Sequence, residues 1–359
     1  MGEKLPTIGI TLGDPYGIGP EVVAKALADD ALRARANYVI FGFSEQFSYA
    51  YDLAEASYPW FRDRHENLRA YSRPIMVLDY DELANPPVME RGPSIWGGRA
   101  SMAFLEDAID ACRRGLLNAL VTAPISKQAW RLAGYRYPGH TELLAKKTGA
   151  RDVAMMFVAP RPGSPIAVHR DWGPLKVVLA TIHEPLLAIR DLLTIGNVFS
   201  KIELADAALR GFFGLPRPRI AVCGLNPHAG ESGRFGDEET RIIEPAIFMA
   251  SENGIDVTGP YPADTLFHRA LGGEFDCVIA MYHDQGLIPV KLLAFDDSVN
   301  LTLGLPFVRT SPSHGTAFDI AGRNKANAGS MRAAIALAVD LASRRPVEPP
   351  SQKPPRRRK

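Results

Sequence analysis

The fold is indicated most clearly by the stretch Thr7-Ile-Gly-Ile-Thr-Leu-Gly-Asp-Pro-Tyr-Gly-Ile-Gly-Pro-Glu-Val-Val-Ala-Lys-Ala26. Residues 7–12 are rich in β-branched side chains and predict a strand, and the glycine-rich residues 13–19 predict a loop. Pro20 stands where a first helical residue is expected, and Glu21 favours a helix N-terminus electrostatically. A strand that runs through a short loop into a helix is typical of a parallel sheet covered by helices.

The same alternation continues on the C-terminal side of this stretch. Residues 38–42 and 119–122 are short β-rich runs, and residues 101–112 place their apolar side chains on one helical face. Alternation of this kind predicts an α/β protein with a largely parallel sheet.

The middle of the chain has a different pattern. Strand-like residues 153–158, 165–168 and 176–182 follow one another, with turn residues at 161–165 and 171–174. This order predicts an antiparallel meander inside a mixed sheet, and helices alternate with strands again from about residue 186.

Length and composition limit the class of protein. The 359 residues suit two α/β lobes, and 46% hydrophobic with 23% charged residues is an ordinary globular composition. A net charge of +1 gives no electrostatic reason to expect nucleic acid or an anionic membrane as partner. The apolar runs are too short to span a bilayer, and the N-terminus lacks the profile of a secretion signal.

The cysteines and the C-terminus add two expectations. Cys112, Cys223 and Cys277 are far apart and match no metal or redox spacing, so we expect buried reduced thiols in a cytoplasmic protein. Residues 346–359 are rich in Pro and Arg and predict a disordered basic tail; a nucleic-acid or targeting patch is the alternative.

Three histidines each follow a predicted strand. His183 follows residues 176–182, His228 comes just after the strand at 219–225, and His283 follows residues 276–282. Ligands bind at the carboxyl ends of strands in open α/β sheets, and three neutral imidazoles with open positions form a catalytic metal site. Imidazole ligands favour zinc, with cobalt, nickel, manganese and magnesium as alternatives. The other interpretation is three hydrogen-bonded loop histidines.

Several polar residues suit a small anionic ligand. Gly139-His-Thr-Glu142 opens a helix whose backbone N–H groups and Thr141 hydroxyl suit an anion, or which is simply capped there. Lys291 and Arg309 suit a phosphate or are ordinary surface charges. Asp264 is either a general base or a helix cap.

The sequence contains neither a Gly-x-Gly-x-x-Gly after a strand nor a Gly-x-x-x-x-Gly-Lys-Ser/Thr motif. A Rossmann loop and a Walker loop are therefore not predicted. Taken by themselves, the residues indicate a metal-dependent enzyme with a small anionic substrate, and they do not indicate hydride transfer.

A set of motifs identifies a family resemblance. The motifs are Thr11-Leu-Gly-Asp-Pro-Tyr-Gly-Ile-Gly-Pro-Glu21, Thr122-Ala-Pro-Ile-Ser-Lys127, Pro138-Gly-His-Thr-Glu142, Asn226-Pro-His-Ala-Gly-Glu231, Met281-Tyr-His-Asp-Gln-Gly286, and the run from Asn300 through Arg309-Thr-Ser to His314-Gly-Thr-Ala-Phe-Asp-Ile-Ala-Gly322. Over nearly the whole chain it resembles the 4-hydroxythreonine-4-phosphate dehydrogenase family of pyridoxal phosphate biosynthesis.

The resemblance implies a particular architecture. It implies two α/β/α lobes with a cleft and a mixed sheet, as in the isocitrate and isopropylmalate dehydrogenases. The first lobe, on the cofactor side, would comprise residues 1–125 plus 300–345, and the second, with metal, substrate and dimer contacts, residues 126–299. A homodimer would share its active site, with metal ligands from both subunits.

The resemblance also implies roles for individual residues. Metal ligands fall on His183, His228 and His283, and catalytic groups on Asp264 and Lys291. Substrate positions fall on His140, Thr141, Lys291, Asn300 and Arg309, and cofactor positions on His314, Gly315, Thr316 and Asp319.

The implied reaction is oxidation of a hydroxyl group with NAD or NADP. A hydroxyl polarised by the cation would lose its proton to Asp264, or to Lys291 through water, while hydride leaves for the nicotinamide. The resulting β-keto acid would then lose carbon dioxide.

One position departs from the family pattern. Ser313 stands where the family usually has an acidic residue, directly before the histidine of His314-Gly-Thr-Ala317. Related substrates, namely 4-phosphoerythronate, 4-phosphothreonate or a cyclic dihydrodiol dicarboxylate, stay open. A metal-dependent acyl or phosphoryl transferase and a non-catalytic metabolite-binding protein are the more remote alternatives.

Overall fold

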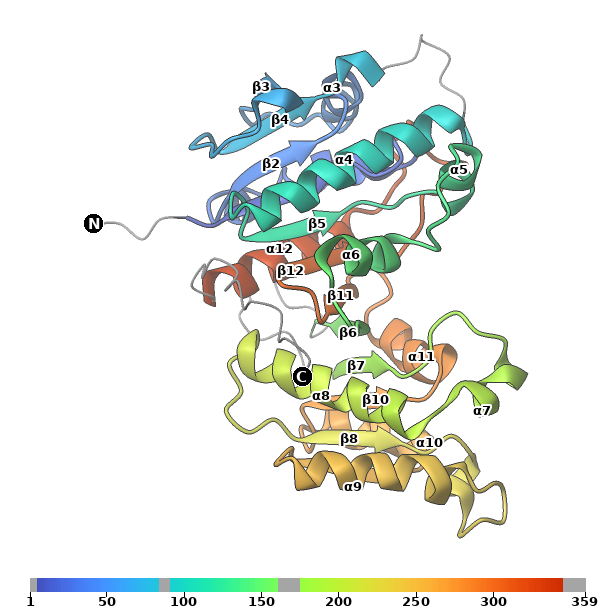
Figure 1. Ribbon diagram of the computed structural model, residues 1–359. Coiled ribbons are helices and arrows are strands. Elements are labelled where there is room, and N and C mark those ends of the chain that lie inside the picture. Colours follow the sequence, from blue (N-terminus) through green and yellow to red (C-terminus); the bar gives the residue numbers. More distant parts are fainter. Residues whose placement is uncertain (1–4, 84–90, 161–174, 345–359) are drawn as a thin grey trace, which may run out of the picture.

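The computed structural model describes residues 5–83, 91–160 and 175–344. Its strands form one twelve-stranded sheet in the order β3-β4-β2-β1-β5-β12-β11-β6-β7-β10-β8-β9 (Figure 1). The strands are β1 (Thr7–Thr11), β2 (Asn37–Phe41), β3 (Phe61–Arg64), β4 (Ile75–Asp79), β5 (Ala119–Thr122), β6 (Ala154–Ala159), β7 (Leu175–Leu179), β8 (Ile220–Cys223), β9 (Val257–Tyr261), β10 (Cys277–Ala280), β11 (Val299–Leu303) and β12 (Val308–Pro312).

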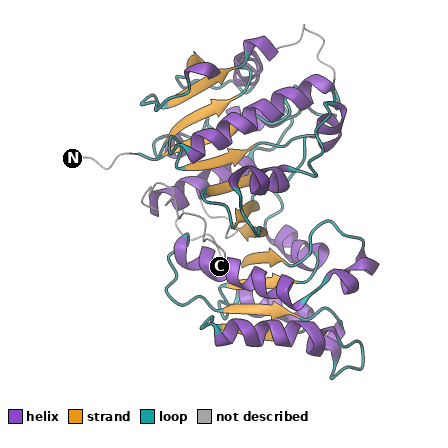
Figure 2. Ribbon diagram, viewed as in Figure 1, coloured by secondary structure: helices purple, strands orange, loops and turns teal. Residues whose placement is uncertain are grey.

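Helices cover both faces of this sheet (Figure 2). They include α1 (Gly19–Ala26), α4 (Ile95–Arg113), α5 (Lys127–Leu132), α6 (His140–Thr148), α7 (Ile189–Leu192), α8 (Ile195–Gly211), α10 (Ala263–Leu271), α11 (His283–Leu293) and α12 (Gly329–Arg344). The remaining α-helices among the described residues are α2 (Asp30–Arg33), α3 (Ser44–Leu53) and α9 (Glu244–Glu252).

The sheet is mixed, which confirms the predicted α/β class. Strand β11 runs antiparallel to both β12 and β6, and β6 runs antiparallel to β7, whereas the other neighbouring pairs are parallel. The β6–β7 pair confirms that part of the expected meander. Its middle strand at 165–168, both turns and the tail at 346–359 lie outside the described residues.

The opening stretch folds as its sequence predicts. Strand β1 is buried, and α1 begins one residue before Pro20. Neighbouring β2 shows how the two faces are filled. Tyr38 and Ile40 face the cluster shared with α1 and α12, while Val39 and Phe41 face the cluster beneath α4. Burial on both faces explains why these strands read as nearly continuous apolar runs.

The predicted lobe boundary would cross the sheet at the β11–β6 pair. Helices α5 and α6 come before β6 in the chain, and both pack beside α4 (Figure 1). Trp130 and Leu143 accordingly share a core cluster with Phe104 of α4. The division into residues 1–125 plus 300–345 and residues 126–299 stays a prediction.

The three cysteines are buried and free. Burial raises the pKa of all three thiols, to about 12 for Cys277, so they are held as neutral thiols. This confirms the expected buried thiols. Among the described residues, none of the helices is both long and apolar enough to cross a membrane.

Candidate active site

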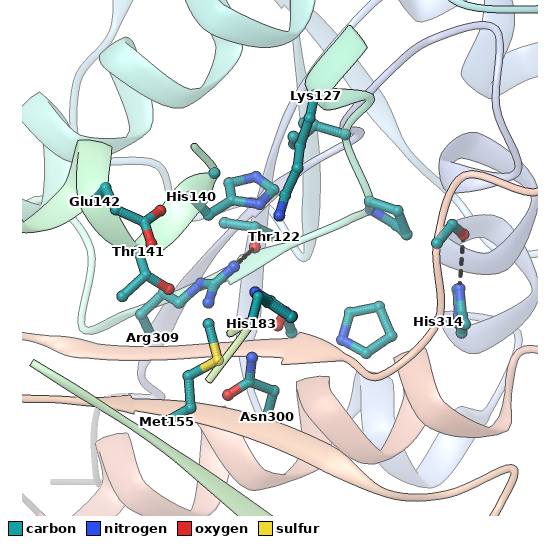
Figure 3. Close-up of a pocket in the computed structure, with 16 residues that line it drawn as sticks. Thr122, Lys127, His140, Thr141, Glu142, Met155, His183, Asn300, Arg309 and His314 are labelled. Atoms are coloured by element: carbon teal, nitrogen blue, oxygen red, sulfur yellow. Dashed lines mark hydrogen bonds between the residues drawn. The ribbon is translucent and has the colours of Figure 1, made fainter. Parts of the chain in front are cut away.

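A small cavity lies at the carboxyl end of β5 and β12, below the start of α6. Its volume is about 170 Å³, and its walls include Thr122, His140, Asn300, Arg309 and His314 (Figure 3). The cavity therefore brings together four of the five substrate positions, because Thr141 also lines it. It forms where polar strand ends meet a helix N-terminus, two places that commonly bind ligands.

Arg309 is the fixed cation of the cavity. Its side chain is 2% exposed, and its two terminal nitrogens donate to Thr302 Oγ1 at 2.9 Å and Thr122 Oγ1 at 2.5 Å. Burial lowers the pKa of Arg309 to about 10, which leaves it charged at neutral pH, and Glu142 opposes the shift. A buried guanidinium held by two neutral hydroxyls keeps its charge available for an anion.

His140 and Thr141 begin α6, with Gly139 as the N-cap. Burial, with the charges of Arg309 and Lys127, holds the pKa of His140 well below its ordinary value, so the imidazole is neutral. The ring packs edge-on against Trp130 at 5.7 Å between centroids, and Thr141 is buried. Packing thus positions both side chains at the N-terminus of α6, whose free backbone N–H groups suit an anion.

Unpartnered polar atoms gather at this cavity. Within the described residues, buried His140 Nε2, Asn300 Oδ1, Arg309 Nε and His314 Nε2 have no hydrogen-bond partner. Buried polar atoms are almost always paired in folded proteins, so a group of unpaired ones in a cavity indicates a ligand. The mixture of a cationic donor, imidazole nitrogens and an amide oxygen fits a small anion that also carries hydroxyl or amino groups.

The sequence-based candidates did not include two charged residues that line the cavity, Lys127 and Glu142. Lys127 begins α5 directly after Ser126, whose hydroxyl caps the helix. Both residues stand inside the family motifs, and a lysine at the start of the helix that follows β5 was the available signal. Figure 3 shows Lys127 and Arg309 on two sides of His140, and Glu142 beside Thr141.

Strand order explains which histidines meet. Strand β10 lies between β7 and β8, and its parallel register pairs Ala280 with Leu179. The chains continue side by side, with Ala180 N–H donating to Ala280 O at 2.8 Å. His183 and His283 therefore lie together, with ring centroids 5.7 Å apart. Burial lowers the pKa of His183, and the charges of Lys127 and His283 add to this, which favours the neutral form that a metal requires.

His228 lies at the end of β8, on the other side of β10, in the turn η5 (Pro227–Gly230). The three imidazoles do not form a compact group within the described part of the chain. There, only His65, Glu66 and Glu82 bring all their ligand atoms within 4.8 Å of one another. The single chain thus assembles two of the three metal candidates, and the complete set stays a prediction.

The two catalytic candidates lie outside the walls of the cavity formed by the described residues. Asp264 is exposed in the first turn of α10, where Pro262 holds the N-cap position, and α10 packs beside η5. Lys291 lies on α11 and donates to Ser313 Oγ at 2.6 Å and Ser298 Oγ at 3.3 Å. Ser313 directly precedes His314, which lines the cavity. Lys291 therefore contacts the neighbour of a cavity residue and does not line the cavity itself.

Two of the four cofactor candidates line the cavity, and two do not. His314 and Gly315 line the cavity. The carbonyl of Thr316 accepts from Ile18 N–H at 2.9 Å, which joins this segment to the loop before α1, and Asp319 is exposed. The roles of these four residues stay predictions.

Comparison with known proteins places this site in a family. The family model described as "Pyridoxal phosphate biosynthetic protein PdxA" matches residues 34–338. The chain is 44% identical to a 4-hydroxythreonine-4-phosphate dehydrogenase of Geobacter metallireducens over 343 residues, or 95% of this chain and 97% of the relative. It is also 44% identical to a D-threonate 4-phosphate dehydrogenase of Salmonella typhimurium over 338 residues, covering 94% and 99% of the two chains.

A solved structure agrees with these relatives. The crystal structure of a 4-hydroxythreonine-4-phosphate dehydrogenase from Klebsiella pneumoniae matches with a TM-score of 0.80 and 40% identity, covering 94% of this chain and 99% of that one. The relatives and the solved structure cover nearly the whole chain, and the residues matched by the family model include every residue of the cavity. The chain therefore belongs to the family of the pyridoxal phosphate biosynthetic protein PdxA.

Proposed function

We propose that the protein oxidises the C3 hydroxyl of 4-phosphohydroxy-L-threonine with NAD or NADP. The reaction depends on a divalent metal, for which the imidazole ligands favour zinc. The product is a 3-oxo acid that decarboxylates to 3-amino-2-oxopropyl phosphate, in pyridoxal phosphate biosynthesis. The observation that carries the proposal is the buried Arg309 with the unpartnered atoms of His140, Asn300 and His314 around one cavity, in a chain of this family.

The residues of the cavity suit a phosphorylated hydroxy acid. Arg309 presents a charged guanidinium already fixed by Thr302 and Thr122, and the N-terminus of α6 presents backbone N–H groups. Neutral His140 can donate or accept one hydrogen bond without adding charge. Together these groups bind and orient a phosphate without side-chain rearrangement.

Proton transfer is assigned to groups beside the cavity. A cation held by His183, His228 and His283 would polarise the reacting hydroxyl, and the nicotinamide would accept the hydride. Asp264 beside the His228 turn, or Lys291 through water, takes the hydroxyl proton. The ammonium of Lys291 also stabilises the negative charge that develops when carbon dioxide leaves.

We also propose a homodimer with a shared site, in the cytoplasm. All three histidines lie at the surface of the single chain, and large exposed apolar side chains flank two of them. Leu186 (67%) and Leu187 (93%) follow His183, and Ile288 (58%) and Leu292 (83%) lie on the helix that His283 begins. Apolar surface beside an incomplete ligand set supports coverage by a second subunit.

A second substrate is supported by a specific observation. The D-threonate 4-phosphate dehydrogenase relative is as similar to the chain, at 44% identity, as the hydroxythreonine phosphate enzyme of Geobacter metallireducens. The two substrates share the phosphate that Arg309 suits and differ at the amino group. A cyclic dihydrodiol dicarboxylate would place a carboxylate against Arg309 instead.

The deciding experiment is a substrate panel read by nicotinamide absorbance. Full-length protein with zinc is tested with 4-phosphohydroxythreonine, D-threonate 4-phosphate and 4-phosphoerythronate, with NAD and with NADP. The proposal expects the largest kcat/KM for 4-phosphohydroxythreonine and loss of the rate after chelation. A larger value for D-threonate 4-phosphate selects the second substrate, and metal dependence without any absorbance change selects a transferase.

A further inference from the structure

The turn that carries His228 has an unusual backbone. Every residue from His228 to Gly233 has a positive φ, between 43° and 90°. His228, Ala229, Glu231 and Ser232 are not glycines, and such residues rarely adopt this left-handed conformation. A run of this kind persists only where surrounding contacts over-determine it.

One buried carboxylate supplies those contacts. Glu239 Oε1 accepts from the backbone N–H groups of Leu225 at 2.7 Å and Asn226 at 2.8 Å. Its Oε2 accepts from Asn226 Nδ2 at 3.0 Å. The side chain is 2% exposed, and every one of these partners is a donor, so a carboxylate matches them and a neutral amide would not.

The backbone is also packed closely around this carboxylate. A Cβ atom added at Gly230 would lie 2.6 Å from Glu239 Oε2, and one at Gly224 would lie 3.1 Å from Oε1. Glu239 therefore touches the chain on both sides of His228. It also begins a π-helical turn, η6 (Glu239–Ile243), a rare element that is frequent at functional sites.

The neighbouring carboxylate connects this turn to the segment after His183. Glu238 Oε2 accepts from Asn226 Nδ2 at 2.7 Å, and Glu238 Oε1 pairs with Arg190 Nε of α7 at 2.7 Å. On the opposite side, Gln285 Nε2 donates to Gly224 O at 2.8 Å, two residues after His283. The base of the His228 turn is thus bonded to both neighbouring histidine segments.

We infer that Glu239 is a positioning residue, which holds the left-handed turn at 228–233 and thereby sets the direction of the His228 imidazole. The inference rests on the proposed role of His228 as a metal ligand. Both carboxylate oxygens of Glu239 accept hydrogen bonds from the chain, so the role inferred here is not that of a ligand. Glu239 fixes the backbone from which a ligand projects, as outer contacts commonly do at metal sites.

The experiment compares isosteric amide variants of two nearby acids, Glu239 and Asp237, in the full-length protein. Glu239→Gln places an NH₂ group against donors, either the two backbone N–H groups or Asn226 Nδ2. Asp237→Asn makes the same change of charge two residues away, on a side chain that is 56% exposed. His228→Ala gives the benchmark for loss of the ligand.

Two measurements are made on each folded variant. Zinc affinity is measured by competition with a chromogenic chelator, and hydrogen exchange of residues 225–233 is measured in the metal-free protein. We expect Glu239→Gln to speed exchange in this segment and to weaken zinc binding by about 10- to 100-fold. Asp237→Asn should keep both at the wild-type level.

The outcomes separate this inference from the proposed function. Wild-type exchange at 225–233 in Glu239→Gln overturns the inference, whatever happens to zinc. Faster exchange with unchanged zinc affinity also overturns it when His228→Ala weakens zinc binding. If His228→Ala binds zinc like the wild type, the proposed ligand set is wrong, and exchange alone then decides whether Glu239 holds the turn.

Discussion

The anion-binding half and the imidazole half of the site are built in different ways. Arg309 and His140 are fixed inside one chain, by hydroxyls at 2.5 and 2.9 Å and by packing against Trp130. His183 and His228, by contrast, are exposed at strand ends, and only His183 and His283 lie close together. One half is complete in the single chain, and the other is not.

This difference shows what each half requires. A phosphate or carboxylate is recognised by donors that can be prepared in advance, because a buried guanidinium held by neutral oxygens needs no further partner to keep its place. A cation requires several ligands at one point, and three strand ends spaced about 4.8 Å apart in a sheet can deliver them only through their loops. The imidazole half therefore depends on loop conformation and, in our proposal, on a second subunit.

The largest expected effect comes from removing a proposed metal ligand. His228→Ala should reduce kcat/KM by at least about 1000-fold, since the cation contributes several kcal/mol to the reaction. The anion-binding half should survive, so inorganic phosphate should still raise the melting temperature of the variant. Nicotinamide absorbance and a thermal shift assay measure the two effects.

Mixed dimers extend this test to the sharing of ligands. If the ligands come from both subunits, coexpressed His228→Ala and His283→Ala, or His228→Ala and His183→Ala, form one intact site and regain activity. Each variant alone provides the control. If neither mixture regains activity although all the variants fold and exchange subunits, the imidazole half is complete within one chain, and the two halves do not differ in this respect.

The sequence predicted the parts of this site that depend on strands. Alternating patterns placed His183, His228 and His283 at strand ends, and the order β7-β10-β8 brings those ends to one edge. The strands themselves end earlier than the apolar runs suggest, at Leu179, Cys223 and Ala280. Apolar residues continue into buried turns, so hydrophobic pattern alone overestimates strand length.

Other features depend on tertiary contacts that the sequence does not display. Only Gly230 and Gly233 hint at a left-handed turn, because the conformation of His228 is enforced by a carboxylate eleven positions on, at Glu239. Likewise, nothing local to Lys291 predicts that its ammonium bonds Ser313. Lys127 lies in a family motif at the start of α5, but the motif alone does not show that this lysine lines the cavity.

A smaller effect is expected from the preformed half. Arg309→Lys keeps the charge but replaces a fork that bonds Thr302 and Thr122 with a single ammonium. We expect a loss of about 2 kcal/mol in binding the anionic substrate, or about 30-fold in KM, with a smaller change in kcat. Steady-state kinetics measure this, and the thermal shift with phosphate should shrink in parallel. An unchanged KM would show that the anion binds elsewhere.

The smallest expected effect concerns Lys291, which lies between the two halves. Its ammonium donates to neutral oxygens of Ser298 and Ser313, burial lowers the pKa of the ammonium, and Asp296 opposes that shift. Lys291 therefore loses its positive charge as the pH rises through its pKa, which lies below 10.5. The KM of the wild type should increase over this pH range. Ser313→Asp places a carboxylate against the ammonium. This raises the pKa of Lys291 but neutralises its charge toward substrate.

We expect Ser313→Asp to raise KM at neutral pH by about fivefold and to flatten its alkaline increase, because a half-buried ion pair contributes about 1 kcal/mol. Ser313→Asn, of similar size without charge, is the matched control and should keep the pH profile of the wild type. KM measured between neutral and alkaline pH separates the two variants. Identical profiles for Asp and Asn would mean that Lys291 does not face the substrate anion, so that the preformed half consists of Arg309 and its neighbours at the start of α6 alone.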